Sequence, residues 1–296
     1  MSAQGASMGA ARAMAVVGGG TMGVGIVYVF AAAGWQVTVV EPDATRAQAV
    51  QQTLADVAQA GAKRGKLTPQ QVAQVSLGVQ RVASATELPA GLDLVVETVP
   101  ERLALKQQVL AQIDARSPHI IATNTSALSI DQLAASVRDP ARFLGMHFFN
   151  PVWSLPMVEL IRGRHTSPET LALARAFAES TGKTTITVGD VPGFATSRLD
   201  LIASLEAMRM LQDGVASAED IDRAMVIAYR HPIGPLRLSD IVGLDVRLDI
   251  ARHLQVALGE RYAPPRLLEE MVARGELGQK SGKGFFDWPA IPPASR

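Results

Sequence analysis

Six consecutive residues, GGGTMG at positions 18–23, constrain the fold of this chain more than any other feature. They match the pattern G-x-G-x-x-G, with an apolar run before them and a stretch of helical length after them. In that context the pattern is typical of a turn that binds a dinucleotide at a helix N-terminus. Gly18 permits the tight turn, Gly20 lets a pyrophosphate approach, and Gly23 lets the helix pack closely on the strand. The sequence predicts a cofactor site at Gly18, Gly20, Thr21, Met22 and Gly23.

An acid ends the next predicted strand. Glu41 follows the run QVTVV and lies roughly 20 residues after the turn, near the spacing expected of a ribose-binding acid. A carboxylate there accepts both ribose hydroxyls of NAD and repels the 2′-phosphate of NADP. Arg46, the nearest cation, lies inside the next predicted helix. We therefore expect NAD; the alternative is an unrelated glycine turn, with Glu41 as a surface acid.

Strand and helix signals alternate through the first half of the chain, and this rhythm predicts a parallel, doubly wound sheet. The strand candidates are residues 13–17, 36–40, 92–96, 119–123, 143–149, 156–161 and 184–188. Beyond them, apolar residues recur at helical spacing. The expected fold is α/β: a Rossmann-type, mostly parallel sheet over 13–190, followed by an all-helical C-terminal domain over 191–288.

Charge and cysteine content exclude several classes of protein. The 28 basic and 28 acidic residues give a net charge of +0, so we expect neither nucleic acid nor a membrane as partner. The absence of cysteine excludes disulfides and Cys-ligated metals, and no metal site is expected. The longest apolar stretch, 24–35, is too short to cross a bilayer. We expect a cytoplasmic protein with a loose tail at 1–12 and a frayed end at 289–296.

A histidine and a glutamate lie in consecutive strand candidates. His147 closes an apolar strand, and Glu159 lies inside the run MVELI. An acid flanked by apolar residues is costly to bury without a partner. If the two strands are antiparallel neighbours, Glu159 holds one imidazole nitrogen while the other takes a proton from an alcohol. The residues alone fit this acid–base pair and a structural histidine equally well.

The turn Asn124-Thr125-Ser126 follows the strand HIIAT and presents an amide and two hydroxyls. Residue chemistry alone favours an N-cap for the helix that starts near Ile130. Ser129 or Asp131 would serve equally as that cap.

Eight segments together resemble the 3-hydroxyacyl-CoA dehydrogenase family, and especially the bacterial 3-hydroxybutyryl-CoA dehydrogenases. They keep the order of the family over residues 16–288. The segments are VVGGGTMG (16–23), VVETVPERLALK (95–106), ATNTSALSI (122–130), GMHFFNP (145–151), VELIRG (158–163), VPGFATSRL (191–199), HPIGPLRLSDIVGLD (231–245) and GQKSGKGFF (278–286).

The resemblance implies a chemistry. NAD accepts a hydride from C3 of an (S)-3-hydroxyacyl-CoA, His147 acts as general base, Glu159 orients it, and Ser126 lies near the substrate oxygen and the nicotinamide. It also implies a homodimer and a helical domain that closes the acyl-CoA cleft. The further cofactor contacts that it implies are Glu101, Lys106, Asn150 and Lys280.

One position departs from the family pattern. Relatives read G-F-x-x-N-R where this chain has GFATSR, so Ser197 takes the place of an asparagine that contacts the substrate's reacting oxygen region. Serine is shorter and does not present an amide donor and acceptor together. It acts through a water, or the pocket is drawn in. Losing one contact to a developing oxyanion is worth about 10²–10³ in rate.

A short basic cluster, Lys63, Arg64 and Lys66, lies where relatives contact the phosphates of CoA. The alternative is a solvated helix end. Trp153, just past HFFNP, either narrows an acyl pocket or anchors the strand pair. Two other functions stay open at this stage: dehydrogenation of a free hydroxy acid, as in gulonate-type relatives, and non-catalytic NAD binding.

Overall fold

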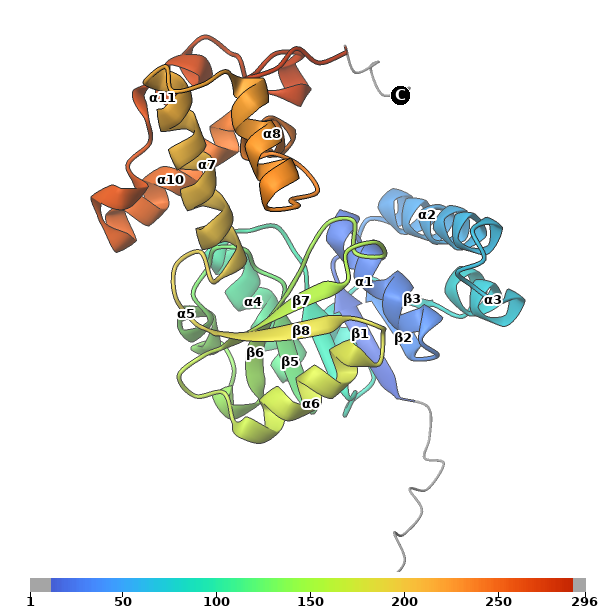
Figure 1. The fold of residues 1–296 in the computed structure, drawn as a ribbon. Coiled ribbons are helices and arrows are strands. Elements are labelled where there is room, and N and C mark those ends of the chain that lie inside the picture. The colour runs from blue at the N-terminus through green and yellow to red at the C-terminus, as the bar shows by residue number, and fades with distance from the viewer. Residues whose placement is uncertain (1–11, 290–296) are drawn as a thin grey trace, which may run out of the picture. The chain divides into compact units, whose positions relative to one another are not determined.

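The computed structural model describes residues 12–289. They form two compact units, one ending at Val191 and the other beginning at Pro192. The first unit is an eight-stranded sheet with helices on both faces, and the second is helical (Figure 1).

The sheet has the order β3-β2-β1-β4-β5-β6-β7-β8. Neighbouring strands run parallel, except that β6 and β7 are antiparallel. This confirms the predicted mostly parallel, doubly wound sheet. The strands are β1 (Ala13–Val17), β2 (Gln36–Val40), β3 (Gln80–Val82), β4 (Leu94–Glu97), β5 (Ile120–Thr123), β6 (Phe143–Phe148), β7 (Met157–Arg162) and β8 (Thr184–Gly189).

Helices cover both faces of the sheet, with α1 and α6 on one face and α4 on the other (Figure 1). The helices of this unit are α1 (Thr21–Ala32), α2 (Ala44–Lys63), α3 (Pro69–Leu77), α4 (Leu103–Asp114), α5 (Ile130–Ala134) and α6 (Pro168–Glu179), with short 3₁₀ turns at Ala85–Glu87 and Pro140–Arg142. The sequence did not predict α3, α6 or β3.

The core explains why the strands read as continuous apolar runs. Strands covered on both faces bury every side chain, and β4 and β6 are buried along their whole length. Each buried Val, Leu, Ile or Phe contributes about 1.5–3 kcal/mol relative to an exposed one. Polar residues inside such strands therefore need a specific partner.

The second unit packs its helices around a separate core that includes Leu201, Leu205 and Leu248. Its helices are α7 (Thr196–Gln212), α8 (Ala218–Ala228), α9 (Pro235–Val242), α10 (Leu244–Leu258) and α11 (Arg266–Ala273), with 3₁₀ turns at Glu260–Tyr262 and Gln279–Ser281. The buried Asp240 accepts hydrogen bonds from the backbone of Phe285 and Phe286 and so holds the C-terminal loop. The predicted helical domain is confirmed.

Within residues 12–289, no helix has the length and apolar character needed to cross a membrane. The predictions of a loose tail at 1–12 and a frayed end at 289–296 concern residues that, apart from 12 and 289, lie outside the described part of the chain.

Candidate active site

Of the three glycines in the pattern, only Gly20 has open space where a side chain would be. Gly18 has a φ of +115°, and a Cβ atom added there would lie 2.9 Å from Thr98 Oγ1. A Cβ on Gly23 would lie 1.9 Å from the Gly18 carbonyl oxygen, whereas one on Gly20 would meet no atom within 4 Å. Gly18 and Gly23 are therefore required by close packing, whereas the structure leaves space beside Gly20.

The same turn forms the N-terminus of α1, which is suited to bind an anion. Gly20 is the N-cap, and in the described part of the chain no side chain caps it and no acid lies in the first turn. The first amide groups of a helix lack intrahelical acceptors and carry the positive end of its dipole. The turn thus fits the pyrophosphate of NAD, for which the backbone N–H groups of Thr21 and Met22 would be donors.

Glu41 lies at this turn, as the sequence predicted. Its side chain is nearly buried, and its two oxygens accept from the Gly19 amide at 3.2 Å and the Asp43 amide at 3.1 Å. Arg46, in the first turn of α2, places Nε 3.4 Å from Glu41 Oε1. The cation is thus closer to the carboxylate than the sequence suggested, and it offsets part of the repulsion toward a 2′-phosphate.

This geometry gives a prediction on cofactor choice. Glu41→Ser removes the repelling carboxylate and releases Arg46 to pair with a phosphate. The ratio of kcat/KM for NADPH to that for NADH should rise by about 10-fold or more, since like-charge contacts cost several kcal/mol. Steady-state rates with both cofactors measure this ratio. Glu87→Ser, at an exposed acid outside the turn, is the control and should leave it unchanged. An unaltered ratio in Glu41→Ser contradicts the assignment.

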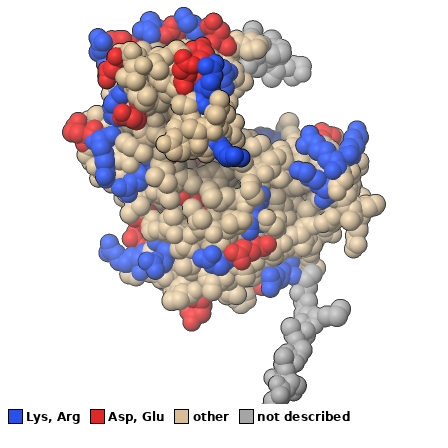
Figure 2. Space-filling model, viewed as in Figure 1, with Lys and Arg blue, Asp and Glu red and all other residues tan. Residues whose placement is uncertain are grey.

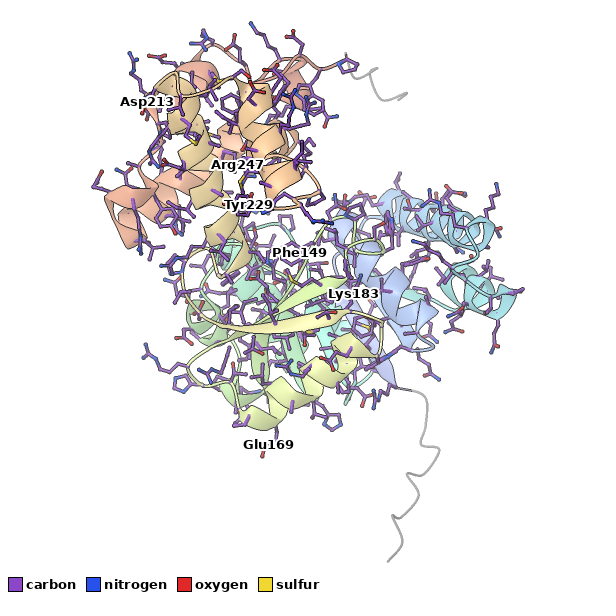
Figure 3. All side chains as sticks on the ribbon, viewed as in Figure 1. Phe149, Glu169, Lys183, Asp213, Tyr229 and Arg247 are labelled. Carbon is purple, nitrogen blue, oxygen red and sulfur yellow. The ribbon has the colours of Figure 1, made fainter. Side chains whose placement is uncertain are left out.

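His147 and Glu159 face each other across the antiparallel pair β6–β7. They are directly opposite in the strand register, and His147 Nδ1 lies 2.8 Å from Glu159 Oε2. Glu159 is fully buried and His147 is 8% exposed. Phe149 packs its ring against the imidazole with centroids 4.4 Å apart. Phe149, which is labelled in Figure 3, directly follows the last residue of β6. The structure therefore brings together the two residues that the sequence paired.

The turn after β5 corrects a sequence-based prediction. Ser129 alone caps α5, accepting from the Gln132 amide. Asn124 instead accepts from the Phe148 amide at 2.9 Å, and the Ser126 amide donates to Glu101 at 3.1 Å. The favoured cap interpretation of this turn was therefore wrong, because its polar groups join β5 to β6 and to Glu101.

The position of Ser126 follows from the sheet. Strands β5 and β6 are parallel, with Thr123 beside Gly145. Ser126 and His147 thus follow paired residues at the carboxyl edge of neighbouring strands, where ligands of open α/β sheets bind. Ser126 is exposed there.

Beneath this turn lies a buried ion pair. Lys106 has no exposed surface, and its Nζ lies 2.9 and 3.0 Å from the oxygens of Glu97 and 3.4 Å from Glu101 Oε2. Glu97 also accepts from the Thr123 hydroxyl at 2.6 Å. Burial raises the pKa of Glu97, and Lys106 acts in the opposite direction. Lys106 therefore holds Glu101, which in turn holds the Ser126 turn.

The sequence predicted cofactor contacts at Glu101 and Lys106 but missed Glu97. Glu101 is 37% exposed, whereas Lys106 is buried behind it. The missed signal was the one that singled out Glu159: an acid within an apolar strand, here LVVE. Asn150 is exposed just after β6.

Two predicted site residues belong to the second unit. Ser197 lies half-buried in the first turn of α7. Lys280 is exposed, and its Nζ lies 2.5 Å from Asp245 Oδ1, an interaction that lowers the pKa of Asp245. The roles of both residues stay predictions.

The predicted basic cluster lies at the end of α2. Figure 2 shows Lys and Arg side chains gathered at α2. Arg64 and Lys66 line a cavity there, and Lys63, which is also exposed, is not among its described lining residues. No group of three His, Cys, Asp or Glu side chains that could hold a metal is found in residues 12–289.

Two family models match the chain. The NAD binding domain of 3-hydroxyacyl-CoA dehydrogenase matches residues 13–191, and the C-terminal domain of the same enzyme matches residues 193–288. The chain belongs to the 3-hydroxyacyl-CoA dehydrogenase family. The predicted family and its NAD-binding domain are thereby confirmed.

Individual relatives agree over nearly the whole chain. A probable 3-hydroxybutyryl-CoA dehydrogenase of Bacillus subtilis is 39% identical over 92% of this chain and 96% of its own length. The crystal structure of (S)-3-hydroxybutyryl-CoA dehydrogenase from Ralstonia eutropha has a TM-score of 0.90 and 39% identity, covering 95% of this chain and all of its own. A 5-formyl-3-hydroxy-2-methylpyridine 4-carboxylic acid 5-dehydrogenase, an NAD⁺-dependent dismutase, has a TM-score of 0.74 and 31% identity, covering 95% and 92%.

Proposed function

We propose that this protein is an NAD-dependent dehydrogenase that interconverts (S)-3-hydroxyacyl-CoA and 3-oxoacyl-CoA, with His147 as general base. The observation that carries the proposal is the 2.8 Å contact between His147 Nδ1 and Glu159 Oε2. It lies on the sheet that also carries the glycine-rich turn. Membership of the family supports the reaction class.

The proton chemistry follows from the His147–Glu159 pair. A carboxylate at Nδ1 keeps the proton on that nitrogen, so proton exchange with the substrate belongs to Nε2. Nε2 accepts the proton of the 3-hydroxyl, and the buried Glu159 stabilises the imidazolium that forms. When bound, NAD supplies the acceptor for the hydride that leaves C3. In the reverse direction His147 returns the proton to the carbonyl oxygen.

The Ser126 turn supplies the second contact to the substrate oxygen. Glu101 fixes the backbone of the turn, so the exposed hydroxyl starts from an anchored position. A preorganised donor costs little reorganisation when charge develops on the oxygen. Ser197, in the position of the family's asparagine, remains a proposed contact to the same region.

The substrate class is the finer part of the proposal. Arg64 and Lys66 offer cations to the phosphates of CoA. A free acid remains the second candidate, because the pyridine carboxylic acid dehydrogenase shares 31% identity with this chain.

A direct assay decides between these functions. The protein should oxidise NADH with acetoacetyl-CoA, and Arg64→Gln should raise KM for that substrate while leaving kcat near normal. Arg81→Gln, at an exposed position on β3, is the matched control. Turnover of a free 3-oxo acid with a KM unaffected by Arg64→Gln would favour the second candidate. No turnover of either substrate would leave only a non-catalytic NAD-binding protein.

A homodimer in the cytoplasm completes the proposal. The second unit exposes large apolar side chains, with Leu199 and Ile227 at 69% and Tyr229 at 72%. Exposed apolar patches often mark interfaces. They support association through this unit; the cytoplasmic location stays a prediction.

A further inference from the structure

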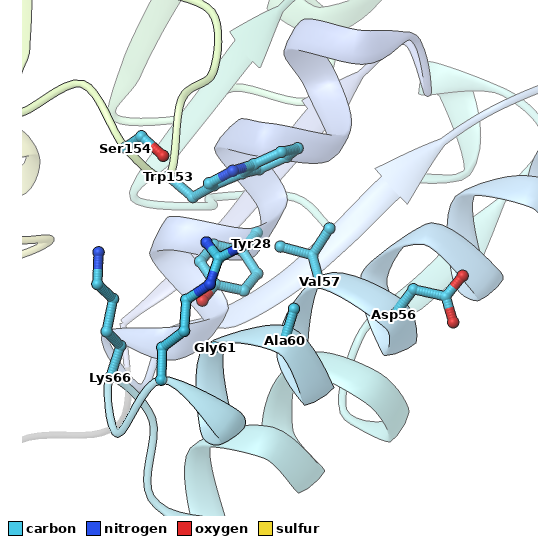
Figure 4. Close-up of a pocket in the computed structure, with 9 residues that line it drawn as sticks. Tyr28, Asp56, Val57, Ala60, Gly61, Lys66, Trp153 and Ser154 are labelled. Atoms are coloured by element: carbon cyan, nitrogen blue, oxygen red, sulfur yellow. The ribbon is translucent and has the colours of Figure 1, made fainter.

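A cavity of about 350 Å³ lies between α1 and α2 (Figure 4). Tyr28 enters it from α1, Asp56 and Val57 from α2, and Trp153 from the turn after β6. Its size is at the small end of ligand sites, which suits a fragment such as a base with its phosphate. Its described lining residues include none of the glycine-rich turn, and Trp153 separates it from a neighbouring cavity that Gly19 and Gly20 line.

Two rings form one wall of this cavity. Tyr28 and Trp153 meet edge to face, with centroids 6.1 Å apart and planes inclined by 71°. Gly61 leaves room for the Tyr28 hydroxyl, since an added Cβ would lie 2.9 Å from it. Trp153 is only half-buried, so part of its indole remains accessible to a planar ligand.

The two ends of the cavity differ in charge. Figure 4 shows Lys66 on one side and Asp56 on the other, with the rings between them. Arg64 adds a second cation to the lining. This order matches a ligand that has a phosphate next to a flat ring with hydrogen-bond donors. The phosphate would lie at Arg64 and Lys66 and the ring on Trp153. An exocyclic amine of the ring would lie near Asp56.

The turn that carries Trp153 is fixed in place. The buried Lys183 donates to the carbonyl oxygens of Val152 and Leu155, which lie on either side of Trp153. The distance from Lys183 Nζ to the Leu155 oxygen is 2.6 Å. Figure 3 labels Lys183 just before β8. Val152 packs against Gly25, where an added Cβ would lie 2.6 Å from its own. The indole is thereby preorganised, which lowers the entropy lost on binding.

We propose that Trp153, backed by Tyr28, is a specificity-determining platform on which the adenine of the acyl-CoA stacks while Arg64 and Lys66 bind its phosphates. The inference rests on the proposed function. It assigns Trp153 to the nucleotide end of the substrate rather than to an acyl pocket or a purely structural anchor. Lys183 is the positioning residue that holds this platform.

Truncated substrates test the platform. Trp153→Leu should raise KM for acetoacetyl-CoA about 10-fold with kcat little changed, because base stacking on an aromatic side chain accounts for about this factor or more. KM for acetoacetyl-N-acetylcysteamine, a thioester without the nucleotide, should not change. Trp153→Phe should restore most of the loss. Lys183→Met should reproduce the Trp153→Leu effect on KM for the CoA thioester alone.

Binding of adenosine 3′,5′-bisphosphate, measured by calorimetry, gives a readout independent of turnover. Wild type should bind it, and Trp153→Leu should bind it about 10-fold more weakly. Arg81→Gln, outside the cavity, should bind as wild type does. Equal effects of Trp153→Leu on both thioesters, or an effect confined to KM for NADH, would overturn the platform. If wild type turned over neither thioester but Trp153→Leu weakened the bisphosphate, the proposed function would fail and the platform would stand.

Discussion

Replacing His147 with glutamine is expected to lower kcat for acetoacetyl-CoA reduction by about 10²–10⁴-fold, the usual contribution of a positioned acid–base group. The glutamine amide retains a donor toward Glu159 but exchanges no proton with the substrate. The affinity for NADH should stay within about 2-fold, because the glycine-rich turn and Glu41 lie on other strands. Steady-state absorbance of NADH gives kcat, and fluorescence titration gives the affinity.

A second histidine provides the control. His119→Gln alters an exposed residue just before β5. It lies at the amino-terminal ends of the strands, whereas His147 lies at the carboxyl-terminal end of β6, so the variant should retain full activity. The double variant His147→Gln/Glu159→Gln should be no slower than His147→Gln alone, since members of a catalytic pair act as one unit. Retention of wild-type kcat in His147→Gln would exclude the proposed base.

The sequence indicated this pair but left it open against a structural histidine. His147 and Glu159 lie in apolar strands where a polar residue needs a partner. The antiparallel register of β6 and β7, which the sequence left as a condition, places them opposite each other. The glycine-rich turn was predictable from its pattern, because the close approach of Gly23 to the Gly18 carbonyl lies within one β-α unit. The contact of Gly18 with Thr98, which follows β4, was not.

Contacts between charged side chains were not predictable from local pattern. Lys106 lies on the buried face of α4 with Leu110 and Ile113, and nothing in the sequence indicates that it is buried against Glu97 and Glu101. The Ser126 turn had the composition of a helix cap, and only the position of Glu101 in space decides otherwise.

The missed elements differ in kind. Helix α3 had a usable signal, a capping box from Thr68 to Gln71 with Pro69 at the first helical position. Helix α6 had a similar one in Ser167 and Pro168. Strand β3 has three residues at the edge of the sheet and buries little, so no pattern marks it.

The largest effect on stability is expected at the Glu97–Lys106 pair. Removing one partner of a buried ion pair leaves an uncompensated charge, which costs about 3–5 kcal/mol of the free energy of unfolding. Glu97→Gln and Lys106→Met should each show this loss. The double variant should lose less than the sum of the two, by about 1–3 kcal/mol, because neither charge remains.

The pH dependence gives a second readout of the same pair. Burial raises the pKa of Glu97 above its ordinary value of 4.5, so the folded protein binds this proton at a higher pH than the unfolded chain. The stability gained from that proton is fully present below pH 4.5 and is lost as the pH rises through the raised pKa. Lys106→Met removes the cation that opposes burial and should extend this loss to higher pH. Glu97→Gln should abolish it.

Urea unfolding of the four proteins across this pH range measures both effects. The exposed pair Arg252–Glu269, with side chains 57% and 46% accessible, is the control. Arg252→Met should cost less than about 1 kcal/mol, because solvent screens such pairs. Additive losses in the double variant, or a pH profile in Glu97→Gln identical to wild type, would show that Glu97 and Lys106 do not act as a pair. If folded Lys106→Met loses NADH-dependent activity, we attribute the loss to Glu101 and the Ser126 turn, because Lys106 contacts Glu101.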